Sequence, residues 1–119
     1  MPKPPAWLSK DAKAVWRSVA SILTVERKTL TEGDLGTLES YCTATGTVRE
    51  TQRVLSRDGV VIVNAKAELK RHPAIGIQNA AMQTARLCAS ELGLTPVSRS
   101  RPSVRAEEAT DDDDNPLAI

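Results

Sequence analysis

The sequence contains no phenylalanine, and Trp7, Trp16 and Tyr41 are its only aromatic residues among 119. Large side chains supply much of the area that a small domain buries, so a chain with so few of them builds only a thin core. Association with further copies of the same chain is a common remedy for a thin core. The sequence therefore predicts one domain at most, completed by self-association.

Histidine and cysteine are also scarce, which excludes most metal and catalytic chemistry. His72 is the single histidine, and the two cysteines, Cys42 and Cys88, lie far apart in separate predicted helices. A zinc site needs several such ligands at short spacing, so we predict no metal and no cofactor. The cysteines are interpreted as small buried thiols and His72, beside Pro73, as a turn or cap residue. The chain also lacks a phosphate-binding loop motif and any Ser/His/Asp arrangement, so it is not expected to be an enzyme.

The sequence has no apolar run long enough to span a membrane. The segment Met1-Pro2-Lys3-Pro4-Pro5 leads directly into a polar, amphipathic stretch and does not resemble a signal peptide. We therefore expect a soluble, cytosolic protein with no membrane partner.

The net charge of +1 conceals a strong segregation of charge along the chain. Residues 1–105 hold all 16 lysines and arginines and nine acidic residues, a net charge of +7, whereas residues 106–119 hold six acids and no base. A basic body favours a polyanionic partner, and the acidic tail then has a separate role. The alternative is that the acidic run only keeps the tail solvated and disordered.

The tail ends in an apolar segment that follows the acidic run. Such an arrangement is suited to a short docking peptide, although apolar residues at this place also occur by chance. The candidate partner-binding residues are Asp111, Asp112, Asp113, Asp114, Leu117 and Ile119.

The first part of the chain predicts an extended arm and a helix. Residues 1–8 are rich in proline, and Ser9 after them is a suitable N-cap. Apolar residues recur at helical spacing over residues 12–23, so one face of this helix is buried. Residues 26–29 break the pattern and predict a loop.

A second, longer helix is predicted to follow this loop. Thr31 and Asp34 resemble a capping box, with aspartate in place of the commoner glutamate. The helix extends from there to about Arg57 and ends at Asp58-Gly59. Small residues around Gly46 indicate a close approach of another helix.

A small hairpin and a third helix complete the predicted elements. Val60 to Val63 form a β-branched run that predicts a short strand, and residues 67–70 are placed opposite it as the second strand. Pro73 suits the first turn of the last helix, and Gly93 suits the left-handed residue that ends it after Leu92.

These elements predict a mainly α fold, a long antiparallel helical hairpin with an N-terminal helix and a small β tip. The divisions are an arm (1–8), a helical oligomerisation and DNA-binding domain (9–101) and a disordered acidic tail (102–119). The hairpin has apolar residues on both sides. Neighbouring subunits explain them better, and a groove for a partner helix is the alternative explanation.

Three groups of basic residues are candidates for contact with DNA phosphates, which requires only positive charge at backbone spacing. The alternative is a solvated helix face with local pairs such as Glu50 with Arg53. The candidates are Arg49, Arg53 and Arg57 on the long helix, Lys66, Lys70 and Arg71 around the tip, and Lys10, Lys13 and Arg17 on the first helix.

An ordered series of short motifs over residues 4–101 resembles the small subunit of tailed-phage terminases. Each motif is weak alone, and their order makes the set specific. The resemblance is to the short type, without a full N-terminal helix-turn-helix domain. The motifs are Pro4-Pro5-Ala6-Trp7-Leu8, Trp16, Leu30-Thr31-Glu32-Gly33-Asp34, Tyr41-Cys42, Gly59-Val60-Val61-Ile62, His72-Pro73 and Leu92-Gly93-Leu94-Thr95-Pro96 with Arg99.

This resemblance implies a homo-oligomeric ring that binds double-stranded viral DNA in the host cytoplasm when genome packaging begins. It also implies recruitment and regulation of the large terminase subunit, which holds the ATPase and the nuclease, so that this chain has neither activity. Two alternatives remain, a dimeric DNA-binding regulator and a protein–protein adaptor that does not bind nucleic acid. The number of subunits separates the ring from the regulator, and salt-dependent DNA binding separates both from the adaptor.

Overall fold

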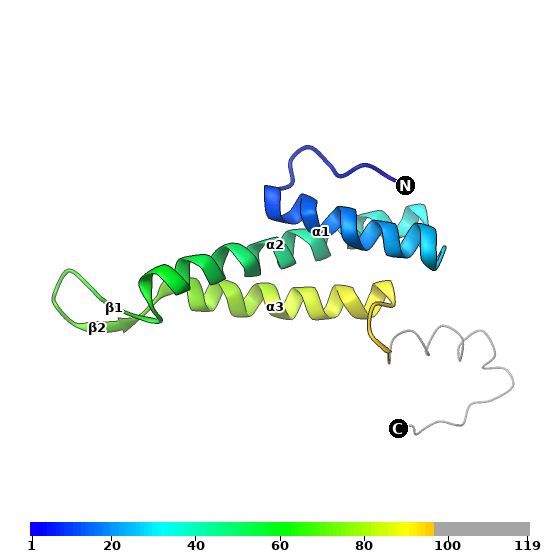
Figure 1. The fold of residues 1–119 in the computed structure, drawn as a ribbon. Helices are drawn as coiled ribbons and strands as arrows, with labels where there is room; N and C mark the ends of the chain where they lie inside the picture. Colours follow the sequence, from blue (N-terminus) through cyan, green and yellow to red (C-terminus); the bar gives the residue numbers. More distant parts are fainter. Residues whose placement is uncertain (97–119) are drawn as a thin grey trace, which may run out of the picture.

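A computed structural model describes residues 1–96 and shows a mainly helical fold with a small two-stranded sheet, which confirms the predicted mainly α class. The described part contains three α-helices, two short helical turns of other types and one two-stranded sheet (Figure 1). In chain order they are α1 (Lys10–Ser21), the π-helical turn η1 (Ile22–Glu26), the 3₁₀ turn η2 (Glu32–Asp34), α2 (Leu35–Asp58), β1 (Val61–Val63), β2 (Leu69–Arg71) and α3 (Pro73–Leu92).

Helix α1 begins where the sequence predicts, because Ser9 accepts a hydrogen bond on its Oγ from the amide of Ala12 at 3.1 Å. Its buried face includes Val15, Trp16 and Val19, at helical spacing. The helix continues into η1, so the chain leaves helical geometry at Arg27 and the predicted loop is one residue shorter.

The capping box predicted ahead of α2 is present. The carboxylate Oδ2 of Asp34 accepts from the amide and the hydroxyl of Thr31, both at 3.0 Å. The box encloses η2, so the regular α-helix begins only at Leu35. It ends at Asp58, followed by Gly59 at a φ of 83°, within a residue of the predicted end.

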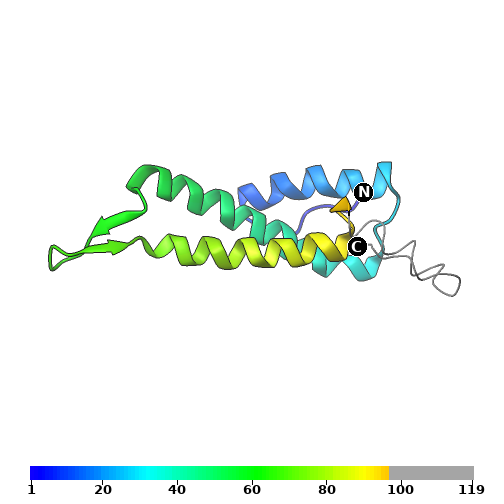
Figure 2. The same cartoon turned by 90° about the horizontal axis from the view of Figure 1, so that it is seen from below.

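Helix α3 runs back alongside α2. Helix α1 crosses α2 in the half of the pair that lies away from β1 and β2 (Figures 1 and 2). The crossing of α1 over α2 is very close, as the small residues around Gly46 predict. A Cβ added to Gly46 would lie 2.9 Å from the backbone nitrogen of Ala12. The absence of a side chain at this position therefore sets the distance between α1 and α2.

The β tip, which is the hairpin of residues 60–71, lies at the far end of the α2–α3 pair (Figure 1). Strands β1 and β2 are antiparallel, with Val61 opposite Arg71 and Val63 opposite Leu69. The side-chain oxygen of Asn64 accepts from the amides of Lys66 and Glu68 at 2.8 and 3.0 Å, which fixes the turn. The second strand lies two residues later than its predicted start.

Both ends of α3 are capped as the sequence predicts. The ring Nδ1 of His72 accepts from the amide of Ala74 at 3.0 Å, and Pro73 occupies the first turn. Gly93 has a φ of 74°, and the amide of Leu94 donates back to the carbonyl of Ala89 at 2.9 Å. His72 is thus a cap residue, as expected.

The hydrophobic core lies at the end of the molecule opposite the β tip. Its most buried large side chains are Trp16, Leu23, Leu38 and Cys42, and Leu92 joins them from α3. The molecule is long and thin, with extents of 64, 36 and 18 Å. None of the described helices is both long and apolar enough to span a lipid bilayer.

Candidate nucleic-acid interface

Two of the predicted basic groups meet where α1 crosses α2. The guanidinium of Arg53 on α2 forms an ion pair with both carboxylate oxygens of Asp11 on α1, with 3.3 Å between Nη1 and Oδ1. The hydrogen bond from Arg53 lowers the pKa of Asp11, and the charges of Arg49 and Lys10 lower it further. Asp11 therefore gathers three of the candidate DNA-binding residues around one carboxylate.

Arg49 is exposed like Arg53, but it differs from Arg53 because it forms no ion pair within residues 1–96. It borders a shallow groove of about 510 Å³ that is also lined by Gln52 and Ser56. The floor of this groove is fixed, because Gln78 of α3 donates to the carbonyl of Val48 at 3.3 Å and to the side-chain oxygen of Gln52 at 3.2 Å. Arg49 is thus an exposed cation without an ion pair, beside an ordered surface, which suits contact with a phosphate.

Arg57 is held in a different way from the other two arginines of this helix. Its Nε and Nη2 atoms donate to the two oxygens of the adjacent Asp58 at 2.7 and 3.0 Å. The ring Nε2 of His72 lies 2.9 Å from Oδ2 of the same carboxylate. Arg57 and then His72 hold the pKa of Asp58 well below its ordinary value. The positive charge of Arg57 is therefore largely balanced by its neighbour.

The local Glu50–Arg53 pair, which the sequence offers as an alternative to DNA contact, is not formed, and Arg53 pairs instead with the more distant Asp11. Glu50 acts on Arg53 only through its charge, which raises the pKa of the arginine after the larger effect of Asp11. The sequence contains Asp11 but gives no sign of which helix face it meets, because that depends on the crossing angle of α1 and α2.

The remaining candidate cations lie on exposed surfaces on either side of this cluster. On α1, Arg17 is exposed and Lys13 is half-buried, farther along the helix from Lys10. At the β tip all three basic residues, Lys66, Lys70 and Arg71, are exposed. The structure therefore joins Lys10 to the arginines of α2 and leaves the tip as a separate basic surface.

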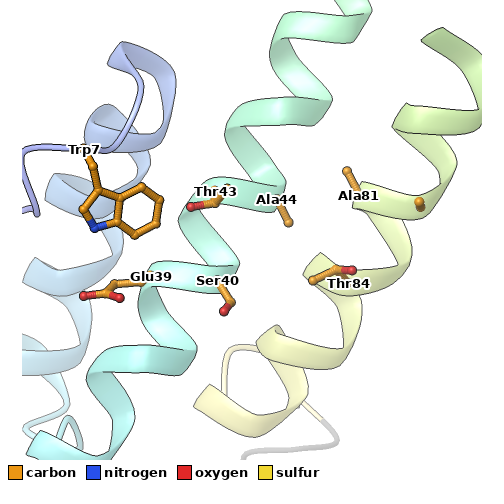
Figure 3. Close-up of a pocket in the computed structure, with 8 residues that line it drawn as sticks. Trp7, Glu39, Ser40, Thr43, Ala44, Ala81 and Thr84 are labelled. Atoms are coloured by element: carbon orange, nitrogen blue, oxygen red, sulfur yellow. The ribbon is translucent and has the colours of Figure 1, made fainter. Parts of the chain in front are cut away.

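A second candidate surface lies between the N-terminal arm, α2 and α3. It is a groove of about 400 Å³ lined mostly by small side chains. Figure 3 shows Ala44 of α2 facing Ala81 and Thr84 of α3, with the indole of Trp7 on the other side of α2 beside Thr43. Trp7 is 65% exposed. A large exposed indole next to a groove of small residues is typical of a protein–protein contact.

The apolar residues of α3 are divided between two faces. Cys88 and Leu92 are buried against the other helices, whereas Ile77 and Leu87 are 55% and 63% exposed. Ile77, Ala80, Thr84 and Leu87 recur at i, i+3, i+7 and i+10, which places them on one face of a helix that continues from the groove. The sequence alone merges the two stripes because their positions interleave along the helix.

Sequence reasoning also missed a contact that joins the first loop to the end of α3. Nη1 of Arg27 donates to the carbonyl oxygen of Gly93 at 3.0 Å. A cation at the C-terminus of a helix interacts favourably with the helix dipole. Nothing in the local sequence around Arg27 signals this contact.

The predicted partner-binding residues Asp111, Asp112, Asp113, Asp114, Leu117 and Ile119 lie outside the described residues.

Within residues 1–96, no group of three or more His, Cys, Asp or Glu side chains is placed to hold a metal ion. Burial raises the pKa of the Cys42 thiol to about 12 and also raises the pKa of Cys88.

The sequence model of the family described as phage terminase, small subunit, matches residues 12–109 of this chain. This match covers most of the sequence, including α2, α3 and the β tip. It begins at the third residue of α1, so Arg49 and Arg53 of the basic cluster lie inside it and Lys10 and Asp11 lie just before it. The chain belongs to the phage terminase small subunits. Membership supports a role in the packaging of phage genomes. Comparison with curated proteins and with solved structures gives no significant match.

Proposed function

We propose that this terminase small subunit binds double-stranded viral DNA, forms a homo-oligomeric ring and recruits the large terminase subunit when packaging begins. Membership in the family supports this proposal, and the basic cluster around Asp11 gives it a specific surface. We propose no catalytic activity for the chain itself. The ATPase and nuclease steps belong to the large subunit in this scheme.

The observation that carries the DNA-binding proposal is the meeting of Lys10 with Arg49 and Arg53 at the crossing of two helices. The three side chains come from two elements and surround one carboxylate that compensates only part of their charge. Residues 1–96 as a whole hold 13 basic and nine acidic residues, a net charge of +4. Contact with phosphates on this surface is sequence-independent and salt-dependent.

The test is a salt series of DNA binding with the double variant Lys10→Ala/Arg49→Ala. Each lost phosphate contact reduces the slope of log affinity against log salt by about 0.9, so the slope falls by about 2. Arg53 is left intact because its loss would leave Asp11 unpaired and weaken the contact between α1 and α2. Arg86→Ala on α3 removes an exposed charge elsewhere and serves as the control. An unchanged slope in the double variant would move the DNA surface away from this crossing.

We further propose that the groove beside Trp7, together with Ile77 and Leu87 of α3, faces the neighbouring copy in the ring. The exposure of these three large side chains supports this assignment. Leu87→Glu should lower the native mass, because it places a charge in the contact. Val25→Glu is the control, since Val25 is equally exposed (63%) but lies in η1.

Native mass spectrometry of the unaltered chain separates the ring from its alternatives. A discrete species well above a tetramer supports a packaging ring. A dimer that binds DNA would instead favour the regulator, and a chain with no DNA binding at any salt concentration would favour the adaptor.

Recruitment of the large subunit is assigned to residues 106–119. Deletion of this segment is expected to leave the number of subunits in the assembly unchanged and to weaken stimulation of the large subunit's ATPase. Loss of assembly in the deletion variant would contradict this assignment. Replacement of the segment by a neutral segment of equal length controls for chain length.

A further inference from the structure

The β tip presents an apolar face that the described residues leave exposed. Val61, Val63 and Leu69 are 54%, 63% and 77% exposed. The register pairs Val63 with Leu69 and Val61 with Arg71, so these side chains share one face of the sheet. A two-stranded sheet is only marginally stable in water without a further element on its face. The tip therefore has an apolar surface on which a further element can pack, and such packing would stabilise its two strands.

Positive charge lies close to this apolar face. Arg71 is on the same face, Lys66 is in the turn, and Lys70, opposite Ile62, is on the other face of the narrow two-stranded sheet. All three are exposed, and Glu68 is the single acid among residues 60–71, a net charge of +2. The carboxylate of Glu68 accepts a hydrogen bond from the side-chain amide of Asn64 at 3.1 Å and so helps to hold the turn of the hairpin. The complementary ligand is a peptide that is both acidic and apolar.

Two other occupants fit this surface less well. A second copy of the tip would complement the apolar face but would bring the three cations of each copy together, which is unfavourable. A nucleic acid would complement the charge but would leave the valine and leucine side chains without an apolar partner. The tip therefore favours a segment that carries both features.

Residues 107–119 of the same chain have both features. They contain six acidic residues and no basic one, and Leu117 and Ile119 follow the acidic run. Helix α3 has 20 residues, so it separates the tip from Gly93 by about 30 Å, and the strands add about 10 Å. The 14 residues from 97 to 110 span up to about 46 Å when extended, which is sufficient.

We propose that residues 111–119 dock on the β tip of their own chain, with the acidic run beside Lys66, Lys70 and Arg71 and the apolar end over Val61, Val63 and Leu69. Tethering gives the tail a local concentration on the order of a millimolar, so a weak contact is enough to populate the docked state. In one respect this proposal rests on the proposed function. The docked tail covers a candidate DNA-binding surface, and binding of the tail by the large subunit exposes that surface.

The docked state is tested on the full chain, without DNA and without the large subunit, by carbodiimide coupling and mass spectrometry. This reagent joins a carboxylate to a lysine amine only where the two are in contact. Tail carboxylates should couple to Lys66 and Lys70 about fivefold more than to Lys10 and Lys13, and an increase from about 0.05 M to 0.5 M salt should remove the preference. An equal distribution over the four lysines would overturn the proposal.

Two variants test the apolar part of the contact. Leu117→Ser/Ile119→Ser keeps every charge and should reduce coupling to the tip severalfold, and Val63→Ser/Leu69→Ser should do the same from the other side. Unchanged coupling in both would leave only a charge attraction and overturn the docking proposal. Coupling between isotopically light and heavy chains in a mixed assembly would place the tail on a neighbouring copy and overturn its same-chain form.

DNA binding is measured separately, so that the two proposals fail independently. The quadruple variant Asp111→Asn/Asp112→Asn/Asp113→Asn/Asp114→Asn should bind DNA several-fold more tightly than the unaltered chain. The same four substitutions should not change DNA affinity in a chain that also carries Lys66→Ala/Lys70→Ala/Arg71→Ala. If no variant binds DNA while the coupling preference persists, the docking stands and the proposed function fails.

Discussion

Gly46 lies against the backbone of Ala12, so close that an added Cβ would be 2.9 Å from the Ala12 nitrogen and 3.2 Å from its Cα. The obstructing atoms belong to the backbone of α1, which has no flexible side-chain end that can move aside. The same region holds the Arg53–Asp11 ion pair. The position of the candidate DNA-binding cluster therefore depends on a glycine that carries no charge itself.

Gly46→Ala is expected to destabilise the protein, although alanine is the better helix former. Helix propensity alone would stabilise α2 by about 1 kcal/mol. We expect overpacking to exceed that gain and to give a net loss of about 1–3 kcal/mol in the free energy of unfolding. Gly36→Ala is the matched control, because nothing lies within 4 Å of its added Cβ and propensity should then act alone. Urea titration of the two variants measures the difference, and a stabilised Gly46→Ala would contradict the close crossing.

The stability of the α2–tip–α3 junction should fall in acid. The pKa of Asp58 is lowered in the folded state by Arg57 and His72 from an ordinary value of 3.8. A lowered pKa means that the unfolded state binds the proton more readily, so the stabilisation is present above about pH 4 and is lost as the pH falls further. Asp58→Asn should remove this part of the acid dependence, and Glu32→Gln is the control for loss of one exposed acid. Thermal unfolding between about pH 2 and pH 7 compares them; parallel curves for the unaltered chain and Asp58→Asn would refute the prediction.

Cys42 should be unreactive in the folded protein. Its side chain is fully buried, and burial raises its pKa to about 12, so almost no thiolate exists at neutral pH. In a Cys88→Ala variant, labelling by a thiol reagent at about pH 8 should proceed only through unfolding and be slower by orders of magnitude than in denaturant. Rapid labelling without denaturant would contradict the burial of Cys42. The denatured sample confirms that the reagent is active.

Arg27→Ala should destabilise the C-terminal end of α3. The variant removes the hydrogen bond to the carbonyl of Gly93 and a cation at the end of a helix. A hydrogen bond from a charged donor contributes about 1.5–3 kcal/mol, and partial exposure places the expected loss near 1–2 kcal/mol. Arg17→Ala, an exposed arginine on α1, controls for the loss of charge. Equal stability of the two variants would show that the contact contributes nothing.

The element boundaries could be predicted from the sequence because local chemistry determines them. Ser9, the Thr31–Asp34 box, His72 and Gly93 each cap a helix through atoms within a few residues of themselves. Such contacts depend on short spacing and residue type, and both are visible in the sequence.

The composition of the candidate sites could not be predicted in the same way. The Arg53–Asp11 pair spans 42 residues and the Arg27–Gly93 contact spans 66, so both depend on how the helices cross. The exposure of Ile77 and Leu87 likewise depends on which side of α3 faces α2. These features are tertiary, and the residues involved look like ordinary charged or apolar positions in the sequence.

His72 has a consequence for how force passes through the molecule. One of its ring nitrogens holds the first turn of α3, the other lies 2.9 Å from the last residue of α2, and its amide donates to the carbonyl of Val60 at 2.8 Å. The two ends of the β tip are thus clamped together at its base. We therefore expect that a partner that displaces the tip moves α2 and α3 together. The displacement then reaches the core, about 30 Å away along α3.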